Sequence, residues 1–304
     1  MSKVAKCLIC PRECNISRDK FLGYCGQNND IKIALAALHY GEEPCISGKN
    51  GSGTIFFTGC SLKCVFCQNY KLSSEYFGSS ISVERLSEIF LELQMQGAEN
   101  INLVTPTHYS LQIIKALDRV KGRLNIPVVY NTGGYEKVET LKLLDDYIDV
   151  YLTDIKYFDA KYAEKYSGSE NYVKYSLLAA EEMLRQKELV FSENGMLKKG
   201  VVIRHLVLPG LRADSLNVLA EIKRRFGTDG FVLSLMSQYT PNNNLENFPE
   251  INRKLTTFEY KSVVDKALEL GFKYCYMQDT SSACDEYIPA FDLSGVKRKA
   301  EIIK

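Results

Sequence analysis

The feature that most limits the possible folds is a regular alternation of short apolar runs and helical segments from residue 54 onward. The apolar runs cover residues 54–58, 101–105, 127–131, 148–155, 201–208, 231–236 and 272–277. Apolar residues at helical spacing fill about 82–97, 109–121, 136–146, 171–187, 213–226 and 257–270. Strand–helix units repeated in this way build parallel sheets with right-handed crossovers. Six full units and a seventh strand predict an α/β fold, a partial (β/α)6 TIM-like barrel, with a doubly wound open sheet as the alternative.

Composition and charge exclude several classes of protein. The 304 residues include 38 Lys and Arg against 37 Asp and Glu, and 45% are hydrophobic. That apolar fraction supports a large core, which rules out a disordered chain. A net charge of +1 gives no support for a nucleic-acid partner bound through bulk electrostatics. No apolar run approaches the roughly 20 residues of a membrane span and the N-terminus lacks a secretory stretch, so we expect a cytoplasmic protein without a membrane partner.

Cysteines crowd the N-terminal end of the chain. Four of the ten share the spacing C-x2-C-x3-C-x10-C: Cys7, Cys10, Cys14 and Cys25. In a reducing cytosol such spacing indicates a metal site, and either zinc or a second [4Fe-4S] cluster would suit four thiolates. So short a segment buries too little apolar surface to fold alone. We therefore divide the chain into a cysteine-rich metal-binding segment, residues 1–53, and a barrel domain, residues 54–304.

Three further cysteines follow the first predicted strand with the spacing C-x3-C-x2-C: Cys60, Cys64 and Cys67. Soft thiolates at this spacing suit an iron–sulfur cluster, and three local ligands leave one iron of a four-iron cluster open to a substrate or cofactor. The alternatives are a zinc site with a remote fourth ligand and a buried cysteine stripe on a helix, against which Gly59 and Ser61 argue. The scattered Cys45, Cys275 and Cys284 are expected to be small buried side chains.

Polar residues gather at the C-terminal ends of several predicted strands, where βα barrels place their chemistry. They are Thr105, Thr107 and His108, then Asn131 and Thr132, then Asp154 and Lys156, and finally Met236, Ser237 and Gln238. Strand ends that face loops are commonly polar, so each of these residues also has an ordinary structural interpretation.

The cysteine loop, FTGCSLKCVFCQNY at residues 57–70, has an aromatic residue, Phe66, before its third cysteine. This pattern resembles the radical S-adenosylmethionine (radical SAM) superfamily. More closely, the chain resembles the pyruvate formate-lyase activating enzyme homologues of the PflX type. The matching stretches span most of the chain and include CLICPRECNISR, GYCG, LHYGEEPCISGKNGSG, YLTDIKYFD, KYSGSENY and RHLVLPG.

The resemblance implies a [4Fe-4S] cluster on Cys60, Cys64 and Cys67, whose open iron binds the amino and carboxylate groups of S-adenosylmethionine (SAM). Reductive cleavage of SAM would give a 5′-deoxyadenosyl radical that abstracts hydrogen from a substrate. The preferred substrate is a glycine of a glycyl radical enzyme, and the partners implied are that enzyme and an electron donor such as flavodoxin or ferredoxin.

The resemblance also implies cofactor-binding residues, of which Phe66 is one. The family's Gly-Gly-Glu at the end of the second strand is absent, so Thr105, Thr107 or backbone carbonyls would have to replace it. The turn Asn131-Thr132-Gly133-Gly134 permits close backbone approach to a ligand. Asp154 and Lys156 match an Asp-x-Lys element, and Arg204 matches an arginine suited to a carboxylate, with ordinary salt bridges as the alternative.

Two other functions stay open. Activating enzymes often carry extra clusters in a ferredoxin-like insert after the radical SAM cysteines, but residues 68–100 contain no cysteine. The missing insert favours modification of a peptide or small molecule. The alternative outside enzymes is an iron–sulfur redox sensor, which would not cleave SAM.

Overall fold

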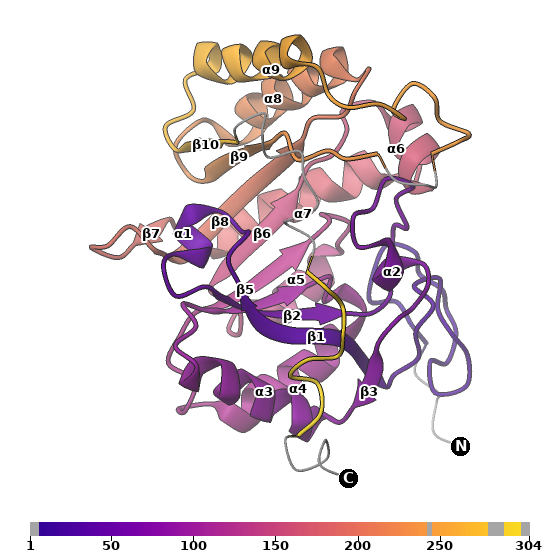
Figure 1. Ribbon diagram of the computed structural model, residues 1–304, viewed down its shortest axis with the longest axis vertical. Helices are drawn as coiled ribbons and strands as arrows, with labels where there is room; N and C mark the ends of the chain where they lie inside the picture. The colour runs from indigo at the N-terminus through magenta and orange to yellow at the C-terminus, as the bar shows by residue number, and fades with distance from the viewer. Residues whose placement is uncertain (1–5, 242–244, 279–288, 299–304) are drawn as a thin grey trace.

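The computed structural model describes residues 6–241, 245–278 and 289–298, and Cys284 lies outside these ranges. Within them, seven strands run parallel to one another: β2 (Ser52–Phe57), β4 (Ile101–Val104), β5 (Val128–Thr132), β6 (Val150–Asp154), β8 (Leu197–Leu206), β9 (Val232–Met236) and β10 (Cys275–Met277). The strand order starts at β10 and reaches β2 through β9, β8, β6, β5 and β4. The sheet curls without closing (Figure 1), so the predicted partial barrel is confirmed.

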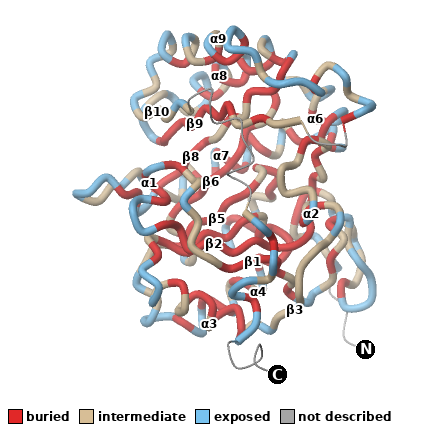
Figure 2. Tube along the Cα trace, viewed as in Figure 1, coloured by how far each residue is buried: buried red, intermediate tan, exposed pale blue. Residues whose placement is uncertain are grey.

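Helices cover the outer face of this sheet (Figure 1). They are α3 (Val83–Met95), α4 (Ser110–Val120), α5 (Val138–Leu144), α7 (Tyr172–Gln186), α8 (Arg212–Phe226) and α9 (Thr257–Leu270). The short η1 (Thr107–Tyr109) follows β4, and α6 (Ala160–Ser167) packs on the cysteine loop at the C-terminal ends of the strands. The main core lies between them and the strands, and Figure 2 shows the strands buried while the outer turns of the helices are exposed. No helix in the described ranges is long and apolar enough to cross a membrane.

Local signals in the sequence explain where the helices begin and end. The Ser82 side chain accepts a hydrogen bond from the backbone N–H of Arg85 and so caps α3. At α9, Thr256 and Glu259 cap each other's backbone N–H groups, and Gly271 ends the helix in the left-handed conformation. All six predicted helices agree with the structure to within two residues at each end, and the largest difference is at α5, which spans 138–144 against the predicted 136–146.

Residues 31–39, which the sequence analysis places in the N-terminal segment, form a strand of the main sheet that was not predicted. This strand, β1 (Ile31–His39), pairs antiparallel with β2, and β3 (Ser79–Ile81) pairs antiparallel with β1. The short β7 (Val190–Phe191) pairs with β8. The strand was missed because β1 follows a turn-rich stretch and because antiparallel strands added beside a parallel sheet lie outside the strand–helix repeat.

The short helix α1 (Pro44–Ser47) fills the end of the barrel opposite the C-terminal ends of the strands (Figure 1). Its Cys45 and Ile46 are buried against residues on the inner face of the strands, among them Val129, Leu152 and Val202. The inner face of the barrel is therefore packed at this end and becomes polar toward the other. The other short helix, α2 (Tyr70–Ser73), lies at that polar end.

Candidate active site

The three cysteines of the C-x3-C-x2-C motif lie on an irregular loop that follows β2 and ends where α2 begins. Cys64 is buried, while Cys60 and Cys67 are half-buried. Gly59 and Lys63 both adopt positive φ, at 91° and 60°, which a helix does not allow. The alternative of a cysteine stripe on a helix is therefore wrong.

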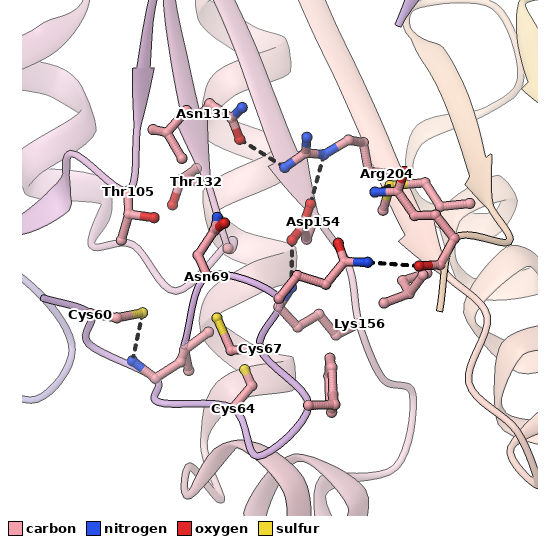
Figure 3. A pocket seen from close by; sticks show the side chains of 18 of the residues that line it. Cys60, Cys64, Cys67, Asn69, Thr105, Asn131, Thr132, Asp154, Lys156 and Arg204 are labelled. Carbon is pink, nitrogen blue, oxygen red and sulfur yellow. Dashed lines mark hydrogen bonds and ion pairs between the residues drawn. The ribbon is translucent and has the colours of Figure 1, made fainter. Parts of the chain in front are cut away.

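One cavity of about 220 Å³ brings most of the predicted site residues together (Figure 3). Its wall includes the three loop cysteines, Phe66, Thr105, Asn131, Thr132, Gly133, Asp154, Lys156 and Arg204. In Figure 3 the cysteines occupy one end, Asn131 and Arg204 the other, and Asp154 and Lys156 lie between them. Glu42, which the sequence analysis did not single out, lines the same cavity.

Charged side chains link the strand ends across the cavity. The Arg204 guanidinium donates from Nε to Asp154 at 2.8 Å and from Nη2 to the Asn131 side-chain oxygen at 2.8 Å. Its Nη1 faces Glu42 at 3.4 Å, so two carboxyl groups and an amide surround it. Lys156 contacts the other oxygen of Asp154. Burial alone would raise the pKa of Asp154, but Arg204 and Lys156 outweigh burial and hold that pKa below its ordinary value.

The cysteine thiols have the chemistry of metal ligands in this setting. Burial raises the pKa of Cys64 to about 12, although Lys156 opposes that shift, and burial also raises the pKa of Cys67. These thiols therefore stay protonated at neutral pH unless a metal stabilises the thiolates. Three thiols on one loop, facing one cavity, fit the donor set of a [4Fe-4S] cluster with one iron not bound by cysteine.

In the described part of the chain, no three His, Cys, Asp or Glu side chains are gathered tightly enough to hold a single metal ion. Each cysteine ligand of a four-iron cluster binds a different iron, so such ligands stand further apart than those of one ion. The spread of Cys60, Cys64 and Cys67 around the cavity is consistent with a cluster.

Thr107 does not line the cavity. Its hydroxyl donates to Glu136 at 2.5 Å, and Thr132 donates to the same oxygen of Glu136. Glu136 is fully buried, and burial raises its pKa to about 7, although hydrogen bonds from Thr107, Thr132 and Tyr130 oppose the shift. This carboxyl group, missed in the sequence, ties the ends of β4 and β5 together. In the sequence, only its position two residues after the Gly133-Gly134 turn could have indicated that Glu136 lies near the site.

Backbone geometry at the same strand ends is unusual. Thr105 has a positive φ of 57°, which is rare for a β-branched residue, and its N–H donates to the Asn131 carbonyl at 2.8 Å. At Gly134 an added Cβ would stand 2.1 Å from the Asp154 carbonyl oxygen, so only glycine fits. The ends of β4, β5 and β6 are thus held close together beside the cavity.

The four N-terminal cysteines lie close to one another on irregular turns. Cys10 and Cys25 are buried, and Cys7 and Cys14 are half-buried. A Cβ added to Gly23 would stand 3.3 Å from the Cys25 sulfur and 3.7 Å from the Cys14 sulfur. Burial raises the pKa of Cys10 to about 12, although the backbone N–H of Arg12 opposes the shift.

This N-terminal segment packs directly on the cysteine loop of the cavity. A Cβ at Gly59 would stand 2.6 Å from the Cys25 carbonyl oxygen. Arg12 donates from Nε to the Ser61 carbonyl at 2.8 Å, and its guanidinium lies 3.9 Å from the centre of the Tyr24 ring. The two cysteine groups therefore belong to adjoining loops.

Comparison with known proteins identifies the class. A family model described as the Radical SAM superfamily matches residues 54–221, and the chain belongs to that superfamily. Membership implies an enzyme whose cofactors are a [4Fe-4S] cluster and SAM.

Among relatives, the chain is 33% identical over 278 residues to the uncharacterized protein MJ0674 of Methanocaldococcus jannaschii, a match that covers 88% of this chain and 75% of the relative. It is 24% identical over 169 residues to the uncharacterized protein MJ0808 of the same organism, covering 50% of this chain and 49% of the relative.

Solved structures of Streptococcus suis SuiB share the fold. SuiB bound to S-adenosylmethionine matches with a TM-score of 0.51 at 14% identity, covering 72% of this chain and 48% of SuiB. SuiB bound to the precursor peptide SuiA matches with a TM-score of 0.50 at 14% identity, covering 72% of this chain and 46% of SuiB. The matched region thus spans about half the length of SuiB.

Proposed function

We propose that this chain holds a [4Fe-4S] cluster on Cys60, Cys64 and Cys67 and cleaves SAM reductively in the adjoining cavity. The single observation that carries the proposal is that these three thiols face the same cavity as the polar ends of β4, β5, β6 and β8. When bound, the cluster and SAM supply a 5′-deoxyadenosyl radical that abstracts hydrogen from the substrate.

The residues of the cavity have distinct roles in this proposal. Among the described residues the Lys156 ammonium donates only to Asp154, so its other N–H groups are available to the methionine carboxylate. The absence of a Cβ at Gly133 permits close backbone approach, and the hydroxyls of Thr105 and Thr132 offer acceptors to the amino group. Phe66 packs beside the loop cysteines, where it excludes water. Arg204, surrounded by Asp154, Asn131 and Glu42, acts by positioning Asp154 rather than by binding the carboxylate itself.

The substrate in this proposal is a protein or peptide. The resemblance to PflX-type activating enzyme homologues favours a glycyl radical enzyme, with flavodoxin or ferredoxin as electron donor. Modification of a smaller peptide is the second candidate, and the fold shared with SuiB, which has been solved with its precursor peptide, favours it. A glycyl radical on the partner protein, detected by electron paramagnetic resonance, would support the first candidate, and its absence with a modified peptide as product would support the second.

We further propose that Cys7, Cys10, Cys14 and Cys25 hold a second metal centre, either zinc, for which the four thiols have to draw closer together, or a second [4Fe-4S] cluster, whose ligands stand further apart. With metal bound to these four cysteines, residues 1–53 would be a metal-binding segment, as the sequence predicts. The close approach of Gly59 to the Cys25 backbone supports a position for this centre beside the first cluster, from which a second cluster would pass electrons to the first.

The deciding experiment is metal and sulfide analysis of anaerobically purified protein combined with a SAM cleavage assay. We expect about four irons with one zinc, or about eight irons without zinc, and formation of 5′-deoxyadenosine after reduction. Protein that carries a complete cluster yet neither cleaves SAM nor changes its cluster spectrum when SAM is added would contradict the proposal. The variant Cys10→Ala should retain cleavage if the N-terminal metal is zinc and lose it if that metal relays electrons.

A further inference from the structure

Behind the cavity, a row of two buried hydroxyl groups ends at one of the three loop cysteines. The Ser167 hydroxyl lies 2.9 Å from the Cys64 sulfur, and the Tyr157 hydroxyl lies 2.8 Å from the same Ser167 oxygen. All three side chains are buried, and Cys64 and Tyr157 belong to one apolar cluster. Hydrogen bonds in such surroundings are electrostatically stronger than they are in water, so this row acts strongly on the sulfur at its end.

The fold brings Ser167 to the cysteine loop through the end of α6. Ser167 is the last residue of the helix, and Gly168 ends it in the left-handed conformation with a φ of 59°. The Val65 N–H donates to the Tyr166 carbonyl at 2.9 Å, so the backbones of the loop and the helix are joined beside the row (Figure 1). This backbone contact holds Ser167 in place against Cys64.

The hydroxyl partner of Cys64 comes from a distant part of the chain. Cys60, by comparison, accepts a hydrogen bond at 3.4 Å from the N–H of Leu62, its near neighbour on the loop. Ser167 is 103 positions away from Cys64. It can therefore be changed without altering the sequence of the loop that holds the three thiols.

The direction of both hydrogen bonds follows once Cys64 is an iron ligand. A thiolate sulfur accepts hydrogen bonds and has no proton to donate, so Ser167 has to donate to it. The Ser167 oxygen then accepts from Tyr157, because a tyrosine hydroxyl keeps its proton at neutral pH. Both O–H groups thus point toward the sulfur, and Tyr157 orients the Ser167 hydroxyl and makes it a better donor.

We propose that Ser167, oriented by Tyr157, raises the reduction potential of the cluster by donating a hydrogen bond to the ligand Cys64. One electron from the donor protein enters the cluster and increases the negative charge on the ligand sulfurs, and no proton is transferred. A hydrogen bond to one of those sulfurs stabilises the added charge. The inference rests on the proposed function, since it concerns the cluster assigned there. Ser167 is a positioning residue in this account, because it acts on SAM only through Cys64.

The test is a redox titration of the cluster-loaded enzyme without SAM, followed by electron paramagnetic resonance of the reduced cluster. In Ser167→Ala, the ratio of reduced to oxidised cluster at a fixed potential should fall by about threefold or more, a shift of about 30 mV for one electron. Ser167→Thr keeps the hydroxyl and should stay close to the wild type. Ser169→Ala is the matched control, because it removes a buried hydroxyl that bonds to Asn171 at 3.0 Å instead of to a cysteine.

Tyr157→Phe tests the second hydrogen bond of the row. It should shift the potential in the same direction as Ser167→Ala but by less, because Ser167 still donates. This variant also decides the question if Ser167→Ala takes up no cluster. If the N-terminal centre is a cluster too, the titration has two steps, and only one of them should move.

A purely structural role for the row would leave the potential unchanged. The wild-type potential in Ser167→Ala, or in Tyr157→Phe where that variant decides, would overturn the inference, and so would an equal shift in Ser169→Ala. A wild type whose cluster responds to these changes as expected, yet never cleaves SAM, would contradict the proposed function and leave the role of Ser167 standing. A chain that takes up no cluster on the loop would overturn both.

Discussion

The N-terminal segment, residues 6–29, and the barrel that it packs against are held together by different kinds of interaction. The barrel strands pair along continuous ladders and bury an apolar core beneath the helices. The N-terminal segment contains no helix or strand, and isolated turns hold it, such as the bond from the Cys7 N–H to the Ile16 carbonyl at 2.8 Å. Its remaining attachments are polar contacts to distant residues.

Those distant contacts show what the segment depends on. Thr140 of α5 donates to the Ile9 carbonyl at 2.6 Å, and Lys137 pairs with Glu13 at 2.6 Å. The Lys137–Glu13 pair lies at the surface, and exposed ion pairs contribute little stability. The barrel would therefore keep its shape without metal, whereas the segment depends on its thiols and on its contact with the cysteine loop. Four predictions, from the largest expected effect to the smallest, test this difference.

The largest effect is expected from Cys64→Ala. This change removes a buried ligand of the proposed cluster and should abolish formation of 5′-deoxyadenosine, while the far-ultraviolet circular dichroism of the barrel stays unchanged. Cys275→Ala is the matched control, because Cys275 lies on β10 outside the cavity wall and should retain activity. Retained cleavage in Cys64→Ala would refute the cluster assignment.

The barrel should respond strongly to the loss of an apolar side chain. Leu103 of β4 is fully buried in the main core, and Leu103→Ala should lower the free energy of unfolding by about 2–5 kcal/mol through lost burial and a cavity. Denaturant unfolding of the metal-free protein measures this value. Met95→Ala, at an exposed position of α3, should change it by less than about 0.5 kcal/mol. Equal effects of the two changes would mean that the metal-free barrel is not folded.

Glu136 should make stability depend on pH. Its pKa of about 7 in the folded chain exceeds the ordinary value of 4.5, so the folded state holds a proton that the unfolded state has lost. The stabilisation is complete below the unfolded pKa and is lost as pH rises through about 7, a change of roughly 1–3 kcal/mol. Glu136→Gln imitates the protonated form, so the free energy of unfolding of this variant should change less with pH in this range. The free energy of unfolding of both proteins is measured between about pH 5 and about pH 8. The same dependence on pH in the wild type and in Glu136→Gln would contradict the raised pKa of Glu136.

The smallest effect is expected where the segment meets the cysteine loop. Arg12→Ala removes the hydrogen bond to Ser61 and the stacking on Tyr24. It should lower the free energy of local opening of the N-terminal segment by about 1 kcal/mol. Faster hydrogen exchange should then be confined to residues 6–29 and the loop around Gly59. Arg12→Lys keeps the charge but not the planar group, and should recover only part of the protection. Exchange that rises equally throughout the barrel would show that the two regions unfold together.

The barrel could be predicted because its elements follow local rules. Ser82 and Gly271 mark helix ends, and the buried strands are continuous apolar runs between helices. The pattern therefore indicates which segments are helices, which are strands, and in what order they follow. The helix α6 was missed because Ala160–Ser167 is short and mixes lysines with tyrosines. The strand β1 was missed because nothing local shows that it joins the sheet beside β2.

Part of the candidate site could also be predicted from the sequence. Cysteine spacing marks Cys60, Cys64 and Cys67, the polar end of a strand marks Asp154, and the family resemblance marks Arg204, and all five line the cavity. Which residues surround Arg204 could not be predicted, because Glu42 lies 162 positions away in the chain. Thr107 was expected to face the cofactor but instead donates to Glu136, a partner that only the tertiary structure reveals.

The attachments of the N-terminal segment also affect the order in which the chain can fold during synthesis. Residues 6–29 are synthesised before the barrel, yet Arg12 meets Ser61 after 49 further residues and Ser167 after 155. Until α6 has been made, the segment lacks part of the surface on which it finally rests. Its four thiols therefore stay accessible to metal donors and to oxidants until those residues have been made.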